Sequence, residues 1–341
     1  MYNKELKLSA PIKVTFNITN KCNFKCIHCY NDSGININFK DSELSIIKIK
    51  LILDELKSIG VIFISINGGE PLIRNDIFEI LKYCKKLGFI VNLNTNGSLI
   101  TYKVATQLYD IGITDIDISY HVDNEEHFQE FTLVKGFDKV KKGIANLIKV
   151  GILPSIAMTI TNYNADFVHK SIKELSKIGI NSIHTIVLVE RGRAKDKKLT
   201  INKSNIKKVY KNLLTEGKKY GISLSLDCPF NLGEEEIRND INGIKLKGGC
   251  FGGLYIACIQ ANGDVTPCAL FPDYIVGNVN ASSFKEIWQK DDMAVLSLNR
   301  FKLNSKCKKC KLLDSCYGGC PTSNYTPNGF LPDYFCPFNE Q

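Results

Sequence analysis

The first two thirds of the sequence alternate short apolar segments with longer segments of helical periodicity. The short segments are rich in Ile and Val and apolar at most positions, as strands buried on both faces are, and they span 12–19, 61–66, 90–94, 115–119, 154–160 and 182–189. Helical segments lie at 42–59, 76–87, 102–111, 137–150, 165–178 and 203–220. A glycine follows each of them, as is typical of a helix C-terminus: Gly60, Gly88, Gly112, Gly151, Gly179 and Gly221.

Six consecutive βα units predict an α/β fold, with a parallel sheet covered by helices. Because six units are too few for an eight-stranded barrel, residues 1–226 are expected to form a partial (β/α)6 TIM-like barrel rather than a doubly wound sheet. In both architectures the functional residues lie at the carboxyl ends of the strands. A seventh β-like segment at 222–227 leads into a predicted connector at 227–249, and residues 250–341 are expected to form a small cysteine-rich domain. That domain has few periodic apolar residues, so bound metal rather than an apolar core is expected to stabilise it.

Thirteen of the 341 residues are cysteines, three of them within 22–29 and eight within 250–336. Clustered cysteines in a reducing compartment indicate metal ligation rather than disulfides. No apolar run reaches the ~18 residues of a membrane span, and the N-terminus lacks the apolar core of a secretory signal. A cytoplasmic protein that does not associate with membranes is therefore expected.

The formal net charge of +9 does not by itself indicate nucleic-acid binding. Only five of the 44 basic residues are arginines, the residue that reads bases and clamps phosphates most effectively. A solvated, lysine-rich surface is the expected reading, with no nucleic-acid partner. An acidic peptide or an acidic electron carrier is compatible with this charge.

Three cysteines with C-x3-C-x2-C spacing follow the first predicted strand: Cys22, Cys26 and Cys29. Three thiolates on one loop can hold three irons of a cubic cluster and leave the fourth iron without a protein ligand. A structural metal site normally fills every coordination position, whereas an open position accepts substrate. A zinc-binding loop is the alternative.

The cysteine loop and the segment Asn67-Gly68-Gly69-Glu70-Pro71, at the end of the second predicted strand, together resemble the radical S-adenosylmethionine (radical SAM) superfamily and its GGEP motif. The resemblance implies a SAM-binding 4Fe–4S cluster on the three cysteines. It also implies reductive cleavage of SAM to a 5′-deoxyadenosyl radical, which takes a hydrogen atom from substrate. Candidate SAM-binding residues are Gly68, Gly69 and Glu70 for the amino group, Asn96 and Ser119 at later strand ends, Arg193 for the carboxylate, and His28 near the adenine.

The C-terminal cysteines resemble the seven-cysteine SPASM pattern at every spacing. The resemblance implies two auxiliary 4Fe–4S clusters, hence three clusters in all. It assigns Cys250, Cys268 and Cys320 to an inner cluster, and Cys307, Cys310, Cys316 and Cys336 to an outer one. Two zinc ribbons are the alternative, although seven cysteines do not divide into two four-cysteine sites.

Three cysteines lie outside these patterns. Cys84 is expected to be a small core residue in a helix. Cys258 is a candidate eighth ligand, for the inner cluster, or else a buried strand thiol. Cys228 is a candidate catalytic hydrogen-atom donor if it lies near the barrel mouth, and otherwise a structural thiol.

The resemblance to SPASM-containing families favours an enzyme that modifies a ribosomally made peptide. Because the first cysteine is already residue 22, no leader-recognising domain is expected before it, and a separate recognition protein is expected instead. A flavodoxin or ferredoxin is expected to donate electrons. The alternatives are oxidative decarboxylation of a tetrapyrrole in haem synthesis and, from another class, a non-catalytic iron–sulfur electron carrier. The open-iron loop with GGEP argues against the carrier.

Replacing Cys22, Cys26 and Cys29 together by Ala should abolish SAM cleavage, because these thiolates alone form the open-iron loop. About two thirds of the iron should remain if one of three similar clusters is lost. Iron analysis of the reconstituted protein and chromatography for 5′-deoxyadenosine measure the two quantities. Full SAM cleavage by the triple variant would contradict the assignment.

Overall fold

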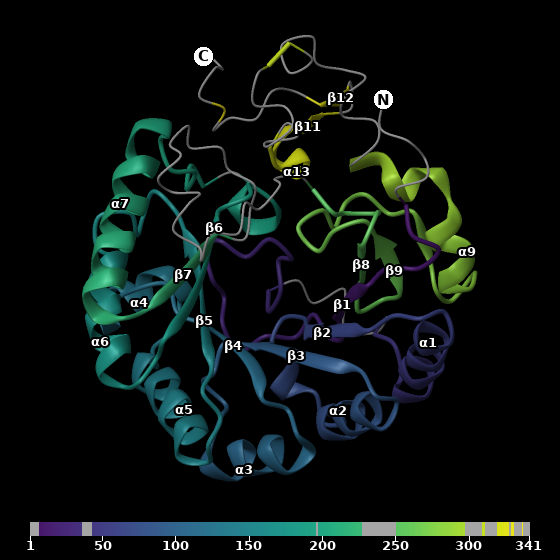
Figure 1. The fold of residues 1–341 in the computed structure, drawn as a ribbon, viewed down its shortest axis with the longest axis horizontal. Helices are drawn as coiled ribbons and strands as arrows, with labels where there is room; N and C mark the ends of the chain where they lie inside the picture. Colours follow the sequence, from purple (N-terminus) through teal and green to yellow (C-terminus); the bar gives the residue numbers. More distant parts are fainter. Residues whose placement is uncertain are drawn as a thin grey trace.

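The computed structural model describes residues 7–35, 43–195, 197–226, 250–296, 309–310, 319–326, 329–330 and 336. Its main element is a ten-stranded sheet with the order β10-β9-β8-β1-β2-β3-β4-β5-β6-β7, and helices lie around its outside (Figure 1). The strands are β1 (Lys13–Asn17), β2 (Phe63–Asn67), β3 (Ile90–Thr95), β4 (Asp115–Ser119), β5 (Ser155–Ile160), β6 (Ser182–Val187), β7 (Ser223–Leu226), β8 (Ile256–Ile259), β9 (Asp264–Thr266) and β10 (Gly277–Asn278). A separate two-stranded sheet pairs β11 (Tyr325–Thr326) with β12 (Gly329–Phe330).

The helices follow the strands in regular alternation. They are α1 (Ile46–Ser58), α2 (Ile77–Lys86), α3 (Tyr102–Ile111), α4 (Glu125–Thr132), α5 (Phe137–Lys149), α6 (Ser171–Lys177), α7 (Lys203–Tyr220), α9 (Phe284–Gln289) and α13 (Pro321–Asn324). Short 3-10 turns lie at Pro71–Ile73, Val168–Lys170, Gly192–Ala194 and Asp291–Ala294.

Strands β1 to β7 are parallel, and each pairs with the next along the chain. A doubly wound sheet would reverse its strand order at a switch point, and this sheet does not. Because β10 and β7 are at its two ends, the sheet curves around an interior without closing (Figure 1). The predicted partial barrel is confirmed.

Local sequence signals explain where several helices begin and end. The Ser45 and Thr101 side chains accept backbone N–H groups at the start of α1 and α3. Gly112 and Gly221 end α3 and α7 with φ of 81° and 69°, a region that side chains disfavour. The sequence did not predict α4, which is short, and α6 begins later than expected, after a 3-10 turn.

Strands β2 to β4 have two different faces. Buried apolar side chains such as Ile66 and Leu93 alternate with half-buried polar side chains that face the barrel interior. Asn92 Nδ2 donates to Asp117 Oδ2 at 2.9 Å, and Asn94 Nδ2 donates to Asn67 Oδ1 at 2.8 Å. The expectation that these strands are apolar on both faces is wrong, because an open barrel leaves its interior in contact with solvent.

The C-terminal region extends the barrel sheet. Strand β8 pairs with β1 in parallel, with Thr15 opposite Cys258, and β9 pairs with β8 in antiparallel. From α9, Phe284, Ile287 and Trp288 are buried in the same apolar core as the barrel strands. Residues 256–294 therefore share the apolar core of the barrel, and the expectation that bound metal rather than an apolar core stabilises this region is wrong for them.

Replacing Trp288 by Ala should destabilise the whole protein and not just its C-terminal part. The ring is 1% exposed, and its Nε1 donates to the Leu8 carbonyl at 2.9 Å. We expect a loss of about 3–5 kcal/mol in the free energy of unfolding, as for other buried aromatic truncations. Denaturant unfolding of metal-free protein, monitored by circular dichroism, measures it.

The control for this experiment is Leu51→Ala on α1, where the side chain is 60% exposed. This change should stay within about 0.5 kcal/mol of the unsubstituted chain. A Trp288→Ala chain with an equally small change would show that α9 does not contribute to the barrel core.

Candidate functional site

A cavity of about 240 Å³ lies at the carboxyl ends of the barrel strands. It is lined by all three cysteines of the predicted cluster loop and by most of the predicted SAM-binding residues: Cys22, Cys26, Cys29, His28, Gly68, Gly69, Asn96, Ser119 and Arg193. Residues separated by more than 160 positions in the sequence thus meet at one place. Glu70 is the one predicted SAM-binding residue that does not line the cavity.

The three loop thiols are close enough to influence one another. Burial raises the pKa of Cys22 to about 12, and the neighbouring Cys29 thiol contributes a smaller increase. Burial also raises the pKa of Cys26, with further contributions from Cys29 and Cys22. A metal that binds Cys22 or Cys26 must therefore displace a proton from the thiol.

The spacing of these thiols fits a cluster better than a single ion. Within the described ranges, no three Cys, His, Asp or Glu side chains converge closely enough to ligate one metal ion. In a cubic cluster each cysteine binds a different iron, so the three sulfurs need not converge on a point. The donor set of Cys22, Cys26 and Cys29 fits a 4Fe–4S cluster.

The loop that carries the cysteines is held by backbone hydrogen bonds on both sides. The N–H groups of Lys25 and Ile27 donate to the Thr132 and Phe131 carbonyls at the end of α4, each at 3.0 Å. On the other side, the Gly69 N–H donates to the Thr19 carbonyl at 2.7 Å. These bonds anchor the loop to the end of α4 on one side and to the turn after β2 on the other.

Gly68 and Gly69 lie directly against the cysteine loop. A Cβ atom on Gly68 would lie 2.5 Å from the Thr19 carbonyl oxygen, and one on Gly69 would lie 2.3 Å from the Lys21 carbonyl oxygen. Gly68 also has a φ of 152°, which disfavours a side chain. Only glycine allows this approach, which lets the turn after β2 form part of the cavity wall.

Glu70 connects the ends of β2 and β3. Its carboxylate is buried and accepts hydrogen bonds from Thr95 Oγ1 at 2.7 Å, from the Asn96 N–H at 2.7 Å and from the Leu72 N–H at 3.1 Å. Burial raises the pKa of Glu70, and the three hydrogen bonds oppose that rise. Its observed partners are the strand-end turns, and its bond to the SAM amino group remains a prediction.

Asn96 and Ser119 lie where the sequence placed them, at the ends of β3 and β4. The Asn96 Nδ2 donates to Asn23 Oδ1 in the cysteine loop at 2.9 Å. Both residues line the cavity, as the predicted SAM contacts require. Asn23 itself was not predicted, because a single Asn in a loop is not distinctive.

Arg193 holds the cysteine loop from the opposite side. Its Nε donates to the Cys26 carbonyl at 2.9 Å, its Nη2 to the Ser33 carbonyl at 2.9 Å, and its Nη1 pairs with Asp32 Oδ1 at 2.7 Å. A guanidinium has five N–H donors, so two remain for the predicted SAM carboxylate. The observed role of Arg193 is to position the loop.

An aromatic wall, which the sequence did not reveal, surrounds His28. The His28 ring stacks on Phe131 with centroids 4.4 Å apart and meets His121 edge-on at 4.6 Å. The His121 Nδ1 accepts the Thr159 N–H at 3.0 Å, so its ring proton is on Nε2. Burial lowers the pKa of His121 to about 4, so this wall is uncharged at neutral pH.

The predicted inner-cluster cysteines also come together. Cys250 and Cys268 pack on the same small apolar group as Phe271. Burial raises the pKa of Cys268, and its cysteine neighbours Cys250, Cys320 and then Cys258 raise it further. Three thiols on separate segments, close enough to influence one another, fit the donor set of a second cluster.

Cys258 and Tyr30 lie between the two cysteine sites. The Cys258 sulfur faces the side-chain amides of Asn17, at 3.7 Å, and Gln260, at 3.5 Å. Burial raises the pKa of Tyr30, and Cys258, Cys29 and Cys268 raise it further in that order. Ligation by Cys258 remains a prediction.

The remaining cysteines divide by location. Cys84 is fully buried in α2, as expected of a core residue. Cys310 and Cys336 are half-buried. Cys228, Cys307 and Cys316 lie outside the described residues, as does the predicted connector at 227–249.

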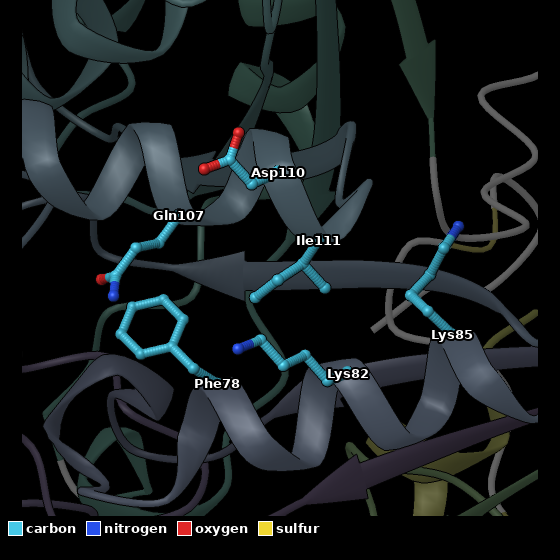
Figure 2. Close-up of a pocket in the computed structure, with 6 residues that line it drawn as sticks. All are labelled: Phe78, Lys82, Lys85, Gln107, Asp110 and Ile111. Carbon is cyan, nitrogen blue, oxygen red and sulfur yellow. The ribbon is translucent and has the colours of Figure 1, made fainter.

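A second depression, of about 350 Å³, lies between α2 and α3 on the outside of the barrel (Figure 2). Its walls are Phe78, Lys82, Lys85, Gln107, Asp110 and Ile111. None of the predicted site residues belongs to it.

No helix within the described ranges is long and apolar enough to cross a bilayer.

Comparison with known families agrees with this geometry. Residues 16–175 match the radical SAM superfamily, and residues 250–311 match the SPASM iron–sulfur cluster-binding domain. The chain belongs to the radical SAM superfamily and carries a SPASM domain, and it is an enzyme of that class.

Its relatives differ in what their names say they do. The chain is 27% identical over 333 residues to an AdoMet-dependent heme synthase of Methanosarcina barkeri, covering 94% of each chain. It is 28% identical over 327 residues to the mycofactocin maturase MftC of Mycolicibacterium smegmatis, covering 94% of this chain and 81% of that one.

A crystal structure of Streptococcus suis SuiB bound to its precursor peptide SuiA has the same fold. The TM-score is 0.79 at 20% identity, and the match covers 98% of this chain and 78% of that one.

Replacing Glu70 by Gln should affect both stability and SAM binding. The amide would put an N–H donor against one of the three donors that now face the carboxylate, which costs about 1–3 kcal/mol in the free energy of unfolding. Loss of the charge should raise the Kd for SAM about ten- to hundredfold if the carboxylate binds the amino group. Denaturant unfolding and equilibrium dialysis measure the two effects.

Glu79→Gln on the exposed face of α2 is the matched control, since among the described residues its carboxylate pairs with Lys50 on the protein surface. This change should leave both quantities unchanged. A Glu70→Gln chain that is less stable but binds SAM normally would limit the role of Glu70 to the turn.

Proposed function

We propose that this enzyme binds SAM in the cavity at the carboxyl ends of β1 to β6 and uses it to abstract a hydrogen atom from a peptide. The observation that supports this most directly is the meeting of Cys22, Cys26 and Cys29 with the Gly68-Gly69 turn around one cavity. When bound, the cluster supplies the electron that cleaves SAM, and SAM supplies the 5′-deoxyadenosyl radical.

The residues of the chain have distinct parts in this proposal. Cys22, Cys26 and Cys29 hold the cluster, and Arg193 fixes the loop that carries them. The Gly68-Gly69 turn and Asn96 bind the methionine part of SAM. The uncharged ring of His28 would pack near the adenine and, with Phe131, would exclude water from the SAM site.

The polarity of the barrel interior favours a peptide substrate. Below the cavity, the interior faces of β2 to β4 present amide and carboxylate groups, among them Asn92, Asn94 and Asp117. Such groups match the donors and acceptors of a peptide. These side chains also bond to one another, and a peptide could use the acceptor capacity that remains on Asn94 and Asp117, whereas the apolar faces of a tetrapyrrole offer no donors to it.

Decarboxylation of a tetrapyrrole propionate is the second candidate. It is favoured by the similarity to a heme synthase, which extends over 94% of both chains. The cofactors proposed for either substrate are SAM and three 4Fe–4S clusters, one on the cysteine loop and two in the SPASM region.

The proposed partners follow from the proposed chemistry. A flavodoxin or ferredoxin supplies the electron, and a separate protein recognises the leader of the peptide. The proposed location is the cytoplasm, where thiols stay reduced.

Isotope transfer should identify the substrate. Breaking a substrate C–D bond and forming a bond to the 5′ carbon places deuterium in 5′-deoxyadenosine. We expect deuterium transfer from a deuterated peptide encoded beside this gene, and none from a tetrapyrrole with deuterated propionates. Anaerobic incubation with SAM and dithionite, followed by mass spectrometry, measures it.

The Cys22→Ala/Cys26→Ala/Cys29→Ala chain should transfer no deuterium, and Cys84→Ala, which removes only a core thiol, should behave like the unsubstituted chain. Transfer from the tetrapyrrole alone would replace the proposal with the second candidate. Absence of any SAM cleavage by the reduced, unsubstituted chain would overturn both.

A further inference from the structure

The segment after β6 carries two arginines on either side of Gly192, and each contacts a different cysteine site. Arg193 binds the cysteine loop, and its backbone N–H also donates to the Cys29 carbonyl at 3.0 Å. Arg191 reaches the C-terminal region, where its Nη2 donates to the Thr322 carbonyl at 2.7 Å. Thr322 belongs to α13. Three consecutive residues therefore connect the two sites.

The contacts of Arg191 lead directly to two inner cysteines. Thr322 Oγ1 lies 3.0 Å from the Cys320 sulfur. The guanidinium carbon of Arg191 lies 5.1 Å from the centre of the Phe271 ring, and the Phe271 N–H donates to the Cys268 carbonyl at 3.0 Å. Arg191 thus contacts both the segment after Cys320 and the turn after Cys268.

The charge of Arg191 is poorly compensated within the described part of the chain. The nearest carboxylate oxygen, on Asp273, is 3.9 Å from Nη1, and the Asp273 side chain is 73% exposed. An exposed pair at this distance contributes little because water screens it. The Nε of Arg191 is inaccessible to solvent and has no hydrogen-bond partner among the described residues.

A cluster held by thiolates is negatively charged and becomes more so when it is reduced. A fixed, partly desolvated cation nearby therefore stabilises the reduced form more than the oxidised form. The planar guanidinium of Arg191 also fixes the positions of two ligands, because it contacts both the segment that carries Cys320 and the turn that carries Cys268.

We propose that Arg191 is a positioning residue for the inner auxiliary cluster and that its charge raises the reduction potential of that cluster. This rests on the proposed inner cluster at Cys250, Cys268 and Cys320, whose presence the same experiment measures. Arg191 acts from the barrel on a cofactor of the C-terminal region, so it couples the two parts of the enzyme.

The test uses the full-length chain in which Cys22, Cys26 and Cys29 are Ala, so that only auxiliary clusters give signals. In this parent, Arg191→Met should shift the equilibrium between oxidised and reduced inner cluster about tenfold toward the oxidised form, which is roughly 59 mV for a one-electron couple. The outer cluster should keep its potential. Redox titration followed by electron paramagnetic resonance, with iron analysis, measures both.

Two further variants separate charge from general destabilisation. Arg191→Lys keeps the charge but lacks the planar fork, so its potential should lie between those of the parent and of Arg191→Met. Arg74→Met is the control, because Arg74 also donates to backbone carbonyls, those of Ile18 and Leu44, and its partners among the described residues, with Asp76, all lie within residues 1–226. It should leave the auxiliary potentials unchanged.

Each outcome decides the proposal. A selective shift in Arg191→Met supports it, as does loss of inner-cluster iron in Arg191→Met with retention in Arg191→Lys. If Arg191→Met keeps the potential and the iron content of the parent, the role of Arg191 is overturned while the proposed clusters stand. Equal losses of inner-cluster iron in Arg191→Met and Arg74→Met would overturn that role as well. Absence of any auxiliary signal in the parent would overturn the proposed clusters and, with them, this inference.

Discussion

The close approach of two backbone segments at the end of β1 and β2 determines the rest of the site. The two strands stop pairing at Asn67, but the Gly69 and Glu70 N–H groups continue to donate to the Thr19 and Lys21 carbonyls. This contact places Cys22, the residue after Lys21, at the edge of the cavity. Because any side chain at Gly69 would collide with the loop, the cluster site depends on a glycine that ligates nothing.

The sequence predicted the barrel well because the signals for it are local. The βα alternation and the C-terminal glycines define the helices, and the order of the strands follows from the chain. The residues of the site were also identifiable, since C-x3-C-x2-C and GGEP are short patterns at strand ends. Their partners were harder to foresee: Arg193 was assigned to SAM, and the structure shows that three of its donors bind the cysteine loop.

Features that depend on distant pairing could not be read from the sequence. Nothing in the segment that forms β8 indicates that it pairs with β1, because the sequence of a short apolar strand does not specify which strand lies beside it. The aromatic wall of His28, His121 and Phe131 combines three separate segments, one of them in the unpredicted α4. The interior polarity of β2 to β4 was masked by their many Ile residues, most of which are buried in the apolar core.

The pairing of β8 with β1 makes the SPASM region more than an appended module. In an isolated βα barrel of this kind, β1 would be an edge strand, with its N–H and C=O groups free to pair with another molecule. Exposed edges of this type promote aggregation, and proteins commonly cover them. Here the cover comes from residues 256–259, after the barrel strands in the sequence. The C-terminal region therefore also protects the β1 edge. A chain cut before residue 250 would leave this edge exposed and able to pair with a strand of another molecule.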